Sequence, residues 1–169
     1  MKTLLIFGSK TGGTTKIVKT IQKRIGMENC DLVDLNDNPK PSLEIYNIIV
    51  IGGPIYAGKL LASVQKYISE NSRELLTKPL AIFTCGMNEP NYQSQLENAF
   101  PENLKSHSFY RGTLGGEYDF EKLNWFERFM VKSISGIKTS MQHYKMEEID
   151  RLVNQISEIE KSHKDIENT

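Results

Sequence analysis

The chain has 169 residues, of which 38% are hydrophobic and 25% are charged, a composition typical of one globular domain and not of a disordered or fibrous chain. Its 21 basic side chains balance its 21 acidic ones, so no overall charge attracts nucleic acid, and no nucleic-acid partner is expected. The 2 cysteines and 3 histidines show no disulfide framework and no metal-ligand spacing, so no metal is expected. No signal peptide and no run of about 18 apolar residues is found, which predicts a cytoplasmic location.

Short apolar runs alternate with segments of helical periodicity. In chain order, the predicted elements are a strand at 4–7, a helix after Thr14, strands at 30–35 and 47–53, a helix after Gly58, strands at 79–86 and 107–112, and a helix around 149–159. Runs that are apolar on both faces are typical of parallel strands covered by helices on both sides, so the expected fold class is α/β. We expect one domain at 1–161, with an insertion at about 114–140, and a frayed polar tail at 162–169.

The segment 122–137 does not fit this alternation. Its apolar residues recur at helical spacing, at Leu123, Phe126, Met130, Ile134 and Ile137. This spacing predicts an extra amphipathic helix after the fifth strand. Its apolar stripe either packs on the helix's own domain or meets a partner or a membrane surface.

A loop rich in hydroxyl groups follows the first predicted strand. Its residues are Ser9, Lys10, Thr11, Gly12, Gly13, Thr14 and Thr15. Backbone N–H groups at a helix start bind phosphate without a cation, because the helix dipole favours an anion there. Threonine stands where a P-loop has its lysine, and the dinucleotide pattern G-x-G-x-x-G is absent, so the loop predicts the single phosphate of a mononucleotide. The alternative is a turn whose hydroxyls only cap the following helix.

Two more loops follow the third and fourth predicted strands, at the edge of a parallel sheet where ligands bind. They supply Pro54, Ile55, Tyr56, Ala57 and Gly58, then Thr84, Cys85, Gly86, Met87 and Asn88, with Tyr92 shortly after. Glycines let backbone approach a flat ring, and Tyr56 or Tyr92 offers a face for stacking. With the phosphate loop, these residues predict a flavin pocket in which Cys85 is interpreted as a small buried thiol.

These motifs resemble known flavoproteins. The pattern Ser9-x-Thr11-Gly12-x-Thr14 is similar to the FMN phosphate loop of the flavodoxins. That resemblance implies a five-stranded parallel sheet of order 2-1-3-4-5 with helices on both faces and FMN where the strand order reverses. Further motifs resemble the menaquinone-dependent protoporphyrinogen oxidase family, namely Ile51-Gly52-Gly53-x-Ile55-x-x-Gly58, Gly115-Gly116-x-Tyr118 and Trp125-Phe126-x-Arg128-Phe129-Met130-Val131-Lys132. In that family, the segment after strand five contributes to the quinone- or porphyrin-related activity.

Three functions stay open at this point. An FMN-dependent oxidoreductase would pass electrons between a small organic substrate and a quinone-like acceptor, with the insertion helix in peripheral contact with the inner face of the cell membrane. A flavodoxin proper would carry electrons between protein partners, and such carriers are typically acidic around the flavin. The first 25 residues contain 6 basic residues and no acidic one, which favours the enzyme. The third reading is a fold relative that binds no flavin, and no catalytic acid or base is identified in any of them.

Overall fold

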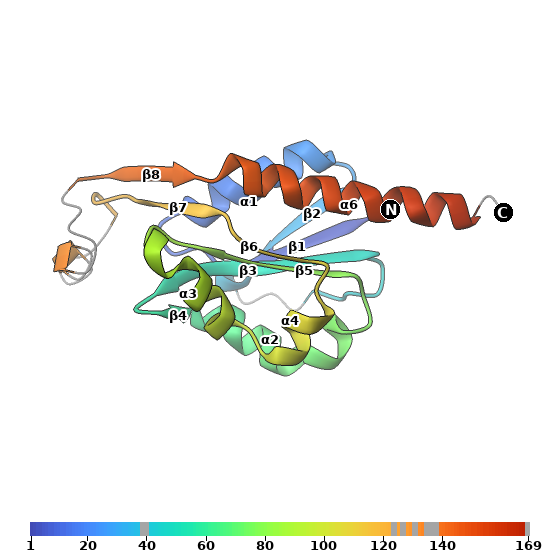
Figure 1. Ribbon diagram of the computed structural model, residues 1–169, viewed down its shortest axis with the longest axis horizontal. Helices are drawn as coiled ribbons and strands as arrows, with labels where there is room; N and C mark the ends of the chain where they lie inside the picture. The colour runs from blue at the N-terminus through green and yellow to red at the C-terminus, as the bar shows by residue number, and fades with distance from the viewer. Residues whose placement is uncertain (38–40, 123–124, 126–127, 130–131, 134–138, 168–169) are drawn as a thin grey trace.

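The computed structural model describes residues 1–37, 41–122, 125, 128–129, 132–133 and 139–167 (Figure 1). In chain order, its elements are β1 (Thr3–Phe7), α1 (Gly13–Ile25), β2 (Cys30–Asp34), the 3-10 turn η1 (Leu35–Asp37), β3 (Ile48–Tyr56), β4 (Lys59–Leu60), α2 (Ala62–Leu75), β5 (Leu80–Cys85), the 3-10 turn η2 (Glu89–Asn91), α3 (Tyr92–Ala99), α4 (Glu102–His107), β6 (Tyr110–Thr113), β7 (Gly115–Tyr118), β8 (Met141–Tyr144) and α6 (Met146–Glu167).

The main sheet has parallel strands in the order β2-β1-β3-β5-β6, and the short β4 pairs antiparallel with the end of β3. Counted over the parallel strands, this is the predicted order 2-1-3-4-5, which is therefore confirmed. Phe7 pairs with Gly52, Gly53 pairs with Thr84, and Thr84 pairs with Thr113, so these strands end in register. The loops that leave β1, β3, β5 and β6 therefore gather at the carboxyl edge of the sheet.

Helices cover both faces of the sheet, with α1 and α6 on one side and α2, α3 and α4 on the other (Figure 1). Successive side chains of a strand point to opposite faces, and β1 shows the result. Leu5 and Phe7 pack in the cluster that α1 and α6 cover, whereas Leu4 and Ile6 pack in the cluster under α2, α3 and α4. All four are buried, as the continuous apolar run predicts.

The structure adds elements that the sequence did not predict, namely β4, α3, α4 and the antiparallel pair β7 and β8, hereafter the β7–β8 hairpin. Helix α6 continues to Glu167, so residues 162–167 of the tail that we expected to fray are helical, and residues 168–169 lie outside the described ones. The polar residues there still allow a helix, since α6 needs an apolar stripe only where it meets the sheet.

The extra helix predicted at 122–137 falls largely outside the described residues. Of those that are described within it, Lys122 lies in a turn, and Trp125, Arg128, Phe129, Lys132 and Ser133 are helical. The side chains of Trp125 and Phe129 are 81% and 62% exposed, so these two rings do not pack in the domain's own core. Within the described ranges, none of the helices is both long enough and apolar enough to cross a bilayer.

Candidate functional site

The phosphate loop, Ser9–Gly12, connects the end of β1 to the start of α1. Gly12 has a φ of 95°, a left-handed conformation that glycine adopts without steric cost, and α1 begins at the next residue. The Gly12 N–H donates to the Ser9 Oγ at 3.2 Å, and Gly12 provides no side-chain cap for α1. The amides of the first turn are left for solvent or an anion, and the helix dipole favours the anion, so the loop fits a phosphate group.

Residues that follow β2 brace the phosphate loop. The Asn36 side-chain amide donates to the Ser9 carbonyl, while the Asn36 Oδ1 accepts from the Ser63 Oγ at 3.2 Å. Asp34 ends β2, and burial raises the pKa of its carboxyl, although the Asn36 N–H donates to it at 3.0 Å. The loop is therefore held in place from both β2 and α2.

A buried carboxylate, that of Glu117 in β7, lies against the start of α1. Its side chain is 5% exposed, and it accepts hydrogen bonds from the Lys16 ammonium at 2.9 and 3.0 Å and from the Tyr144 hydroxyl of β8. The hydrogen bond to Glu117 raises the pKa of Lys16, and burial together with the Glu117 contact raises the pKa of Tyr144. A Cβ atom on Gly13 would come 2.6 Å from the Glu117 Cγ. The present position of the Glu117 side chain therefore requires glycine at residue 13.

The loop after β3 is a tight turn that reaches the phosphate loop. Tyr56 pairs with Lys59 across a turn in which Ala57 has a φ of 47° and Gly58 a φ of 76°, the left-handed pair that favoured two-residue hairpins use. The Lys10 Nζ lies 5.2 Å from the centre of the Tyr56 ring, within cation–π distance. This contact joins two of the three predicted loops.

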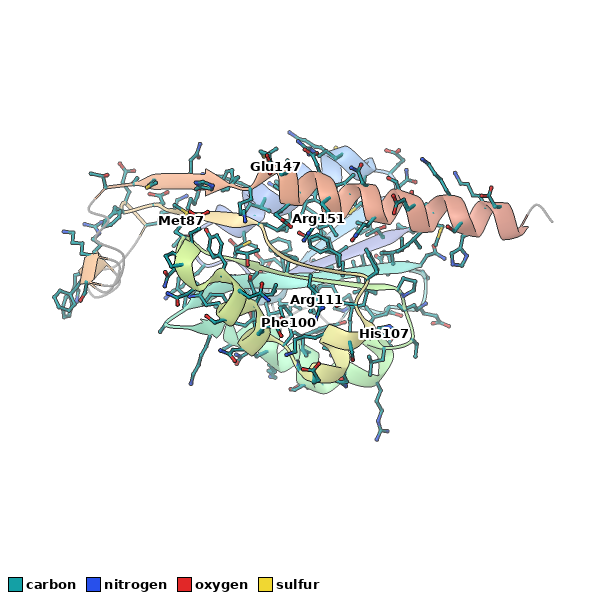
Figure 2. The ribbon with its side chains drawn as sticks, viewed as in Figure 1. Met87, Phe100, His107, Arg111, Glu147 and Arg151 are labelled. Carbon is teal, nitrogen blue, oxygen red and sulfur yellow. The ribbon has the colours of Figure 1, made fainter. Side chains whose placement is uncertain are left out.

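The loop after β5 is fixed by β6 and β7. Thr84 Oγ1 and Thr113 Oγ1 form a buried hydrogen bond of 2.8 Å, and the Gly86 N–H donates to the Gly115 carbonyl at 2.9 Å. Figure 2 shows Met87 beside β7, at the carboxyl edge of the sheet. The third predicted loop is therefore anchored to the strand that carries Glu117.

Tyr92 closes over the same loop. Its hydroxyl donates to the Gly86 carbonyl at 2.8 Å, and the Lys145 Nζ lies 5.4 Å from the centre of its ring. Cys85 is 3% exposed, and burial raises the pKa of its thiol to about 12, against the effect of a hydrogen bond with Thr14. These values agree with the interpretation of Cys85 as a buried thiol.

The predicted site residues thus lie in or beside three loops at one edge of the sheet. Residues 13–15 begin α1, residues 54–56 end β3, which runs three residues further than predicted, Thr84 and Cys85 end β5, and Tyr92 begins α3. The side chains of Thr84 and Cys85 are buried, which leaves their backbone as the part that a ligand can meet. Sequence reasoning missed Glu117, Tyr144 and Lys145, which come from the β7–β8 hairpin and the residue after it. The available signal was the position of Glu117 four residues after the end of β6, in the segment that leaves the carboxyl edge of the sheet.

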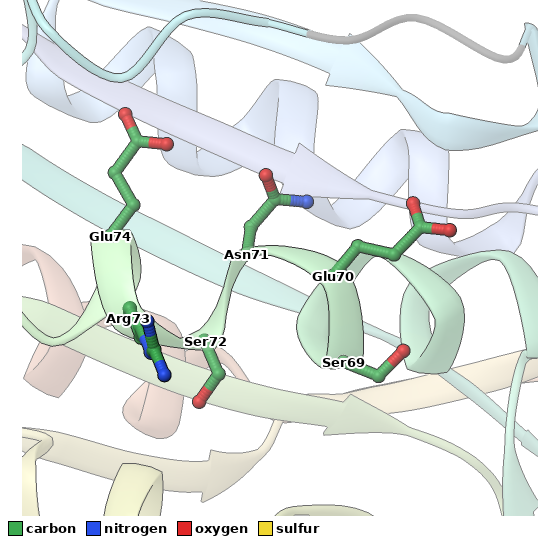
Figure 3. Close-up of a pocket in the computed structure, with 6 residues that line it drawn as sticks. All are labelled: Ser69, Glu70, Asn71, Ser72, Arg73 and Glu74. Carbon is green, nitrogen blue, oxygen red and sulfur yellow. The ribbon is translucent and has the colours of Figure 1, made fainter.

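A separate hollow lies on α2, where Asn71 departs from helical geometry with a φ of −120° and a ψ of 15°. It is lined by the consecutive residues Ser69–Glu74 (Figure 3). Because α2 starts beside the carboxyl edge and runs back across the sheet, the hollow lies toward the other end. None of the predicted site residues lines it.

This arrangement defines an open, doubly wound α/β protein in which the loops after β1, β3 and β5 meet at the switch in strand order. The sequence model of the flavodoxin domain matches residues 4–145, and the chain belongs to the flavodoxin family. This family binds FMN, so the predicted cofactor is confirmed at the level of the family, together with a redox role.

The individual relatives include a dehydrogenase and a flavodoxin. The chain is 24% identical over 143 residues to protoporphyrinogen IX dehydrogenase (quinone) of Escherichia coli strain K12, covering 79% of this chain and 78% of that protein. It is 34% identical over 87 residues to flavodoxin 1 of the same strain, covering 50% of this chain and 49% of that protein. A solved archaeal flavodoxin aligns with a TM-score of 0.50 at 17% identity, covering 67% of this chain and 83% of that one, which bears on the fold alone.

Proposed function

We propose that this chain binds FMN and is an oxidoreductase that passes electrons between a small organic substrate and a quinone-like acceptor. The observation that carries the proposal is the meeting of three loops at the carboxyl edge, joined by the contact of Lys10 with Tyr56 and braced by that of Tyr92 with Gly86. The proposed cofactor contacts are Ser9, Lys10, Thr11, Gly12, Gly13, Thr14 and Thr15 for the phosphate, and Pro54, Ile55, Tyr56, Ala57, Gly58, Thr84, Cys85, Gly86, Met87, Asn88 and Tyr92 for the ring.

FMN supplies the electron-accepting ring, and the protein holds and tunes it. The first turn of α1 and the hydroxyls of Thr11 and Thr14 hold the phosphate. Tyr56 or Tyr92 stacks on a ring face, and glycines such as Gly86 let backbone amides approach the ring's polar edge.

The phosphate assignment is tested with a pair of threonines and a matched control. Replacing Thr11 and Thr14 by valine removes hydrogen bonds to a charged group, each about 1.5–3 kcal/mol, so FMN affinity should fall at least about tenfold. The control is Thr20→Val in the same helix, because the Thr20 hydroxyl donates to the Lys16 carbonyl at 3.0 Å and lies beyond the phosphate loop.

Binding is measured by quenching of flavin fluorescence with FMN and with riboflavin, which lacks the phosphate. Only FMN binding by the double variant should weaken. An FMN affinity that equals the parent's would refute the phosphate assignment.

The insertion between β7 and β8 supports the enzyme over the carrier. It exposes Trp125 and Phe129, and basic residues such as Arg128 and Lys132 share the segment. Exposed aromatic rings beside cations suit a lipid-soluble acceptor or an anionic membrane surface. A relative that matches 79% of the chain is named as a quinone-linked dehydrogenase.

A shortened variant tests this role. Residues 119–140 are replaced by Asn-Gly, which joins Tyr118 to Met141 through a two-residue hairpin turn. In a variant that retains FMN and the parent's melting temperature, oxidation of reduced FMN by a menaquinone analogue should slow, while oxidation by ferricyanide should not. Binding to vesicles of anionic lipid, followed by sedimentation, should also be lost.

The second candidate is an electron carrier, which the similarity to flavodoxin 1 favours. A carrier transfers electrons at its flavin edge and has no need of a quinone site on the insertion. An unchanged quinone rate in the shortened variant would therefore favour the carrier and reject the acceptor site.

A further inference from the structure

We propose that Lys10 and Lys145 act as positioning charges that favour reduced, negatively charged FMN over oxidised FMN, and so raise the potential of the last reduction step. The inference rests on the FMN site proposed above. Neither side chain is proposed to transfer a hydride or a proton. Their charges would instead set how easily the bound flavin is reduced.

The first observation is where the two ammonium groups lie. Lys10 comes from the phosphate loop and Lys145 from the junction of β8 with α6, so they approach from different elements. Each lies over a tyrosine ring proposed for stacking, at 5.2 Å from the centre of Tyr56 and 5.4 Å from the centre of Tyr92.

The second observation is the charge of the loops themselves. Across the residues 9–15, 54–59 and 84–92, the basic residues are Lys10 and Lys59 and the acidic residue is Glu89. With Lys145 added, these loops and the β8–α6 junction carry three basic residues and one acidic residue. Glu117 does not reverse this balance, because its carboxylate is engaged by Lys16.

These charges act on one state of the flavin more than on the other. The oxidised ring is neutral, whereas the fully reduced ring loses a proton near neutral pH and becomes an anion. A fixed ammonium at close range stabilises the anion, and charge near the ring is a principal means by which a protein sets flavin potential. An aromatic face has the opposite effect on an electron-rich ring, so the lysines offset the two tyrosines.

The competing explanation is that each lysine only braces a loop through its tyrosine ring. Bracing would change the affinity for oxidised and reduced FMN alike. A charge effect changes their ratio, which is what a reduction potential measures.

The test compares Lys10→Gln, Lys145→Gln and the double variant with Lys19→Gln, which removes an exposed lysine of α1 outside the three loops. FMN-loaded proteins are equilibrated with reference dyes to obtain the potential of each reduction step. Affinity for oxidised FMN and melting temperature are measured in parallel.

We expect the double variant to lower the affinity for fully reduced FMN about tenfold and to leave the affinity for the oxidised and one-electron-reduced forms unchanged. This lowers the potential of the last, one-electron step by about 59 mV. Lys10→Arg with Lys145→Arg should restore the parent's potential, and the difference should shrink at high salt because exposed charges are screened. The Lys19→Gln control should not move the potential as far.

An unchanged potential in a double variant that binds FMN would overturn the inference, as would arginine variants that shift as much as glutamine variants. A parent chain that binds no FMN would instead overturn the proposed function. The two failures are therefore distinguishable.

Discussion

Replacing Gly13 by alanine isolates the contact between the phosphate-loop helix and the β7–β8 hairpin. Alanine is preferred over glycine inside a helix by about 0.5–1 kcal/mol, so the substitution alone would favour α1. The new Cβ, however, would lie 2.6 Å from the Glu117 Cγ and 3.3 Å from its Cδ, which forces the buried carboxylate to move. Overpacking of this kind costs about 1–3 kcal/mol, so we expect a net destabilisation of up to about 2 kcal/mol.

A double-mutant cycle decides whether this contact is responsible. Glu117→Ala removes the atoms that Gly13→Ala meets, so the two changes together should be more stable than the sum of their separate effects by about 1–3 kcal/mol. Urea unfolding of the four proteins without FMN measures the coupling, and parallel FMN titrations show whether a displaced hairpin also weakens phosphate binding. If Gly13→Ala costs the same with and without the Glu117 side chain, the clash is not the cause and the reasoning fails.

Three further predictions concern the site and its core. In Gly116→Ala, the new Cβ would lie 3.0 Å from the Gly86 carbonyl oxygen, so FMN titration should give about threefold to tenfold weaker binding, and equal affinity would refute this strain on the loop. Burial raises the pKa of Cys30 and Cys85 to about 12. A disulfide reagent at pH 8 should therefore label these thiols only as urea unfolds the chain. Rapid labelling of the native protein would contradict their burial. Burial also raises the pKa of Asp34, so the folded protein keeps this carboxyl protonated to higher pH than the unfolded chain does, and stability falls as pH rises through the folded pKa. Asp34→Asn should therefore raise the urea midpoint more at pH 7 than at pH 3. Equal increases at the two pH values would contradict the raised pKa.

The strands of the sheet were predictable because the sequence marks them without help from distant residues. Leu4–Phe7 and Ile48–Ile51 are buried on both faces, so their apolar runs are continuous and end at a glycine where the chain leaves the sheet. The phosphate loop was predictable for a related reason, because its hydroxyls and glycines are contiguous.

The missed elements lack such local marks. In α3, Leu96 is the buried residue, and α4 has six residues, which is too short for a helical period to repeat clearly. The residues Gly115–Tyr118 and Met141–Tyr144 show no apolar alternation and become strands by pairing with each other across the insertion. Glu117 meets Lys16 across 101 residues of sequence, a contact that no spacing rule anticipates.

The β7–β8 hairpin also determines what a change in the length of the insertion costs. The insertion leaves the domain at Tyr118 and returns at its pairing partner Met141, so its two ends lie one strand spacing apart, about 5 Å. Each doubling of a loop's length adds only about 0.6 kcal/mol to the entropy of closing it. This segment can therefore be lengthened or trimmed at small cost while the sheet and the phosphate loop stay unchanged.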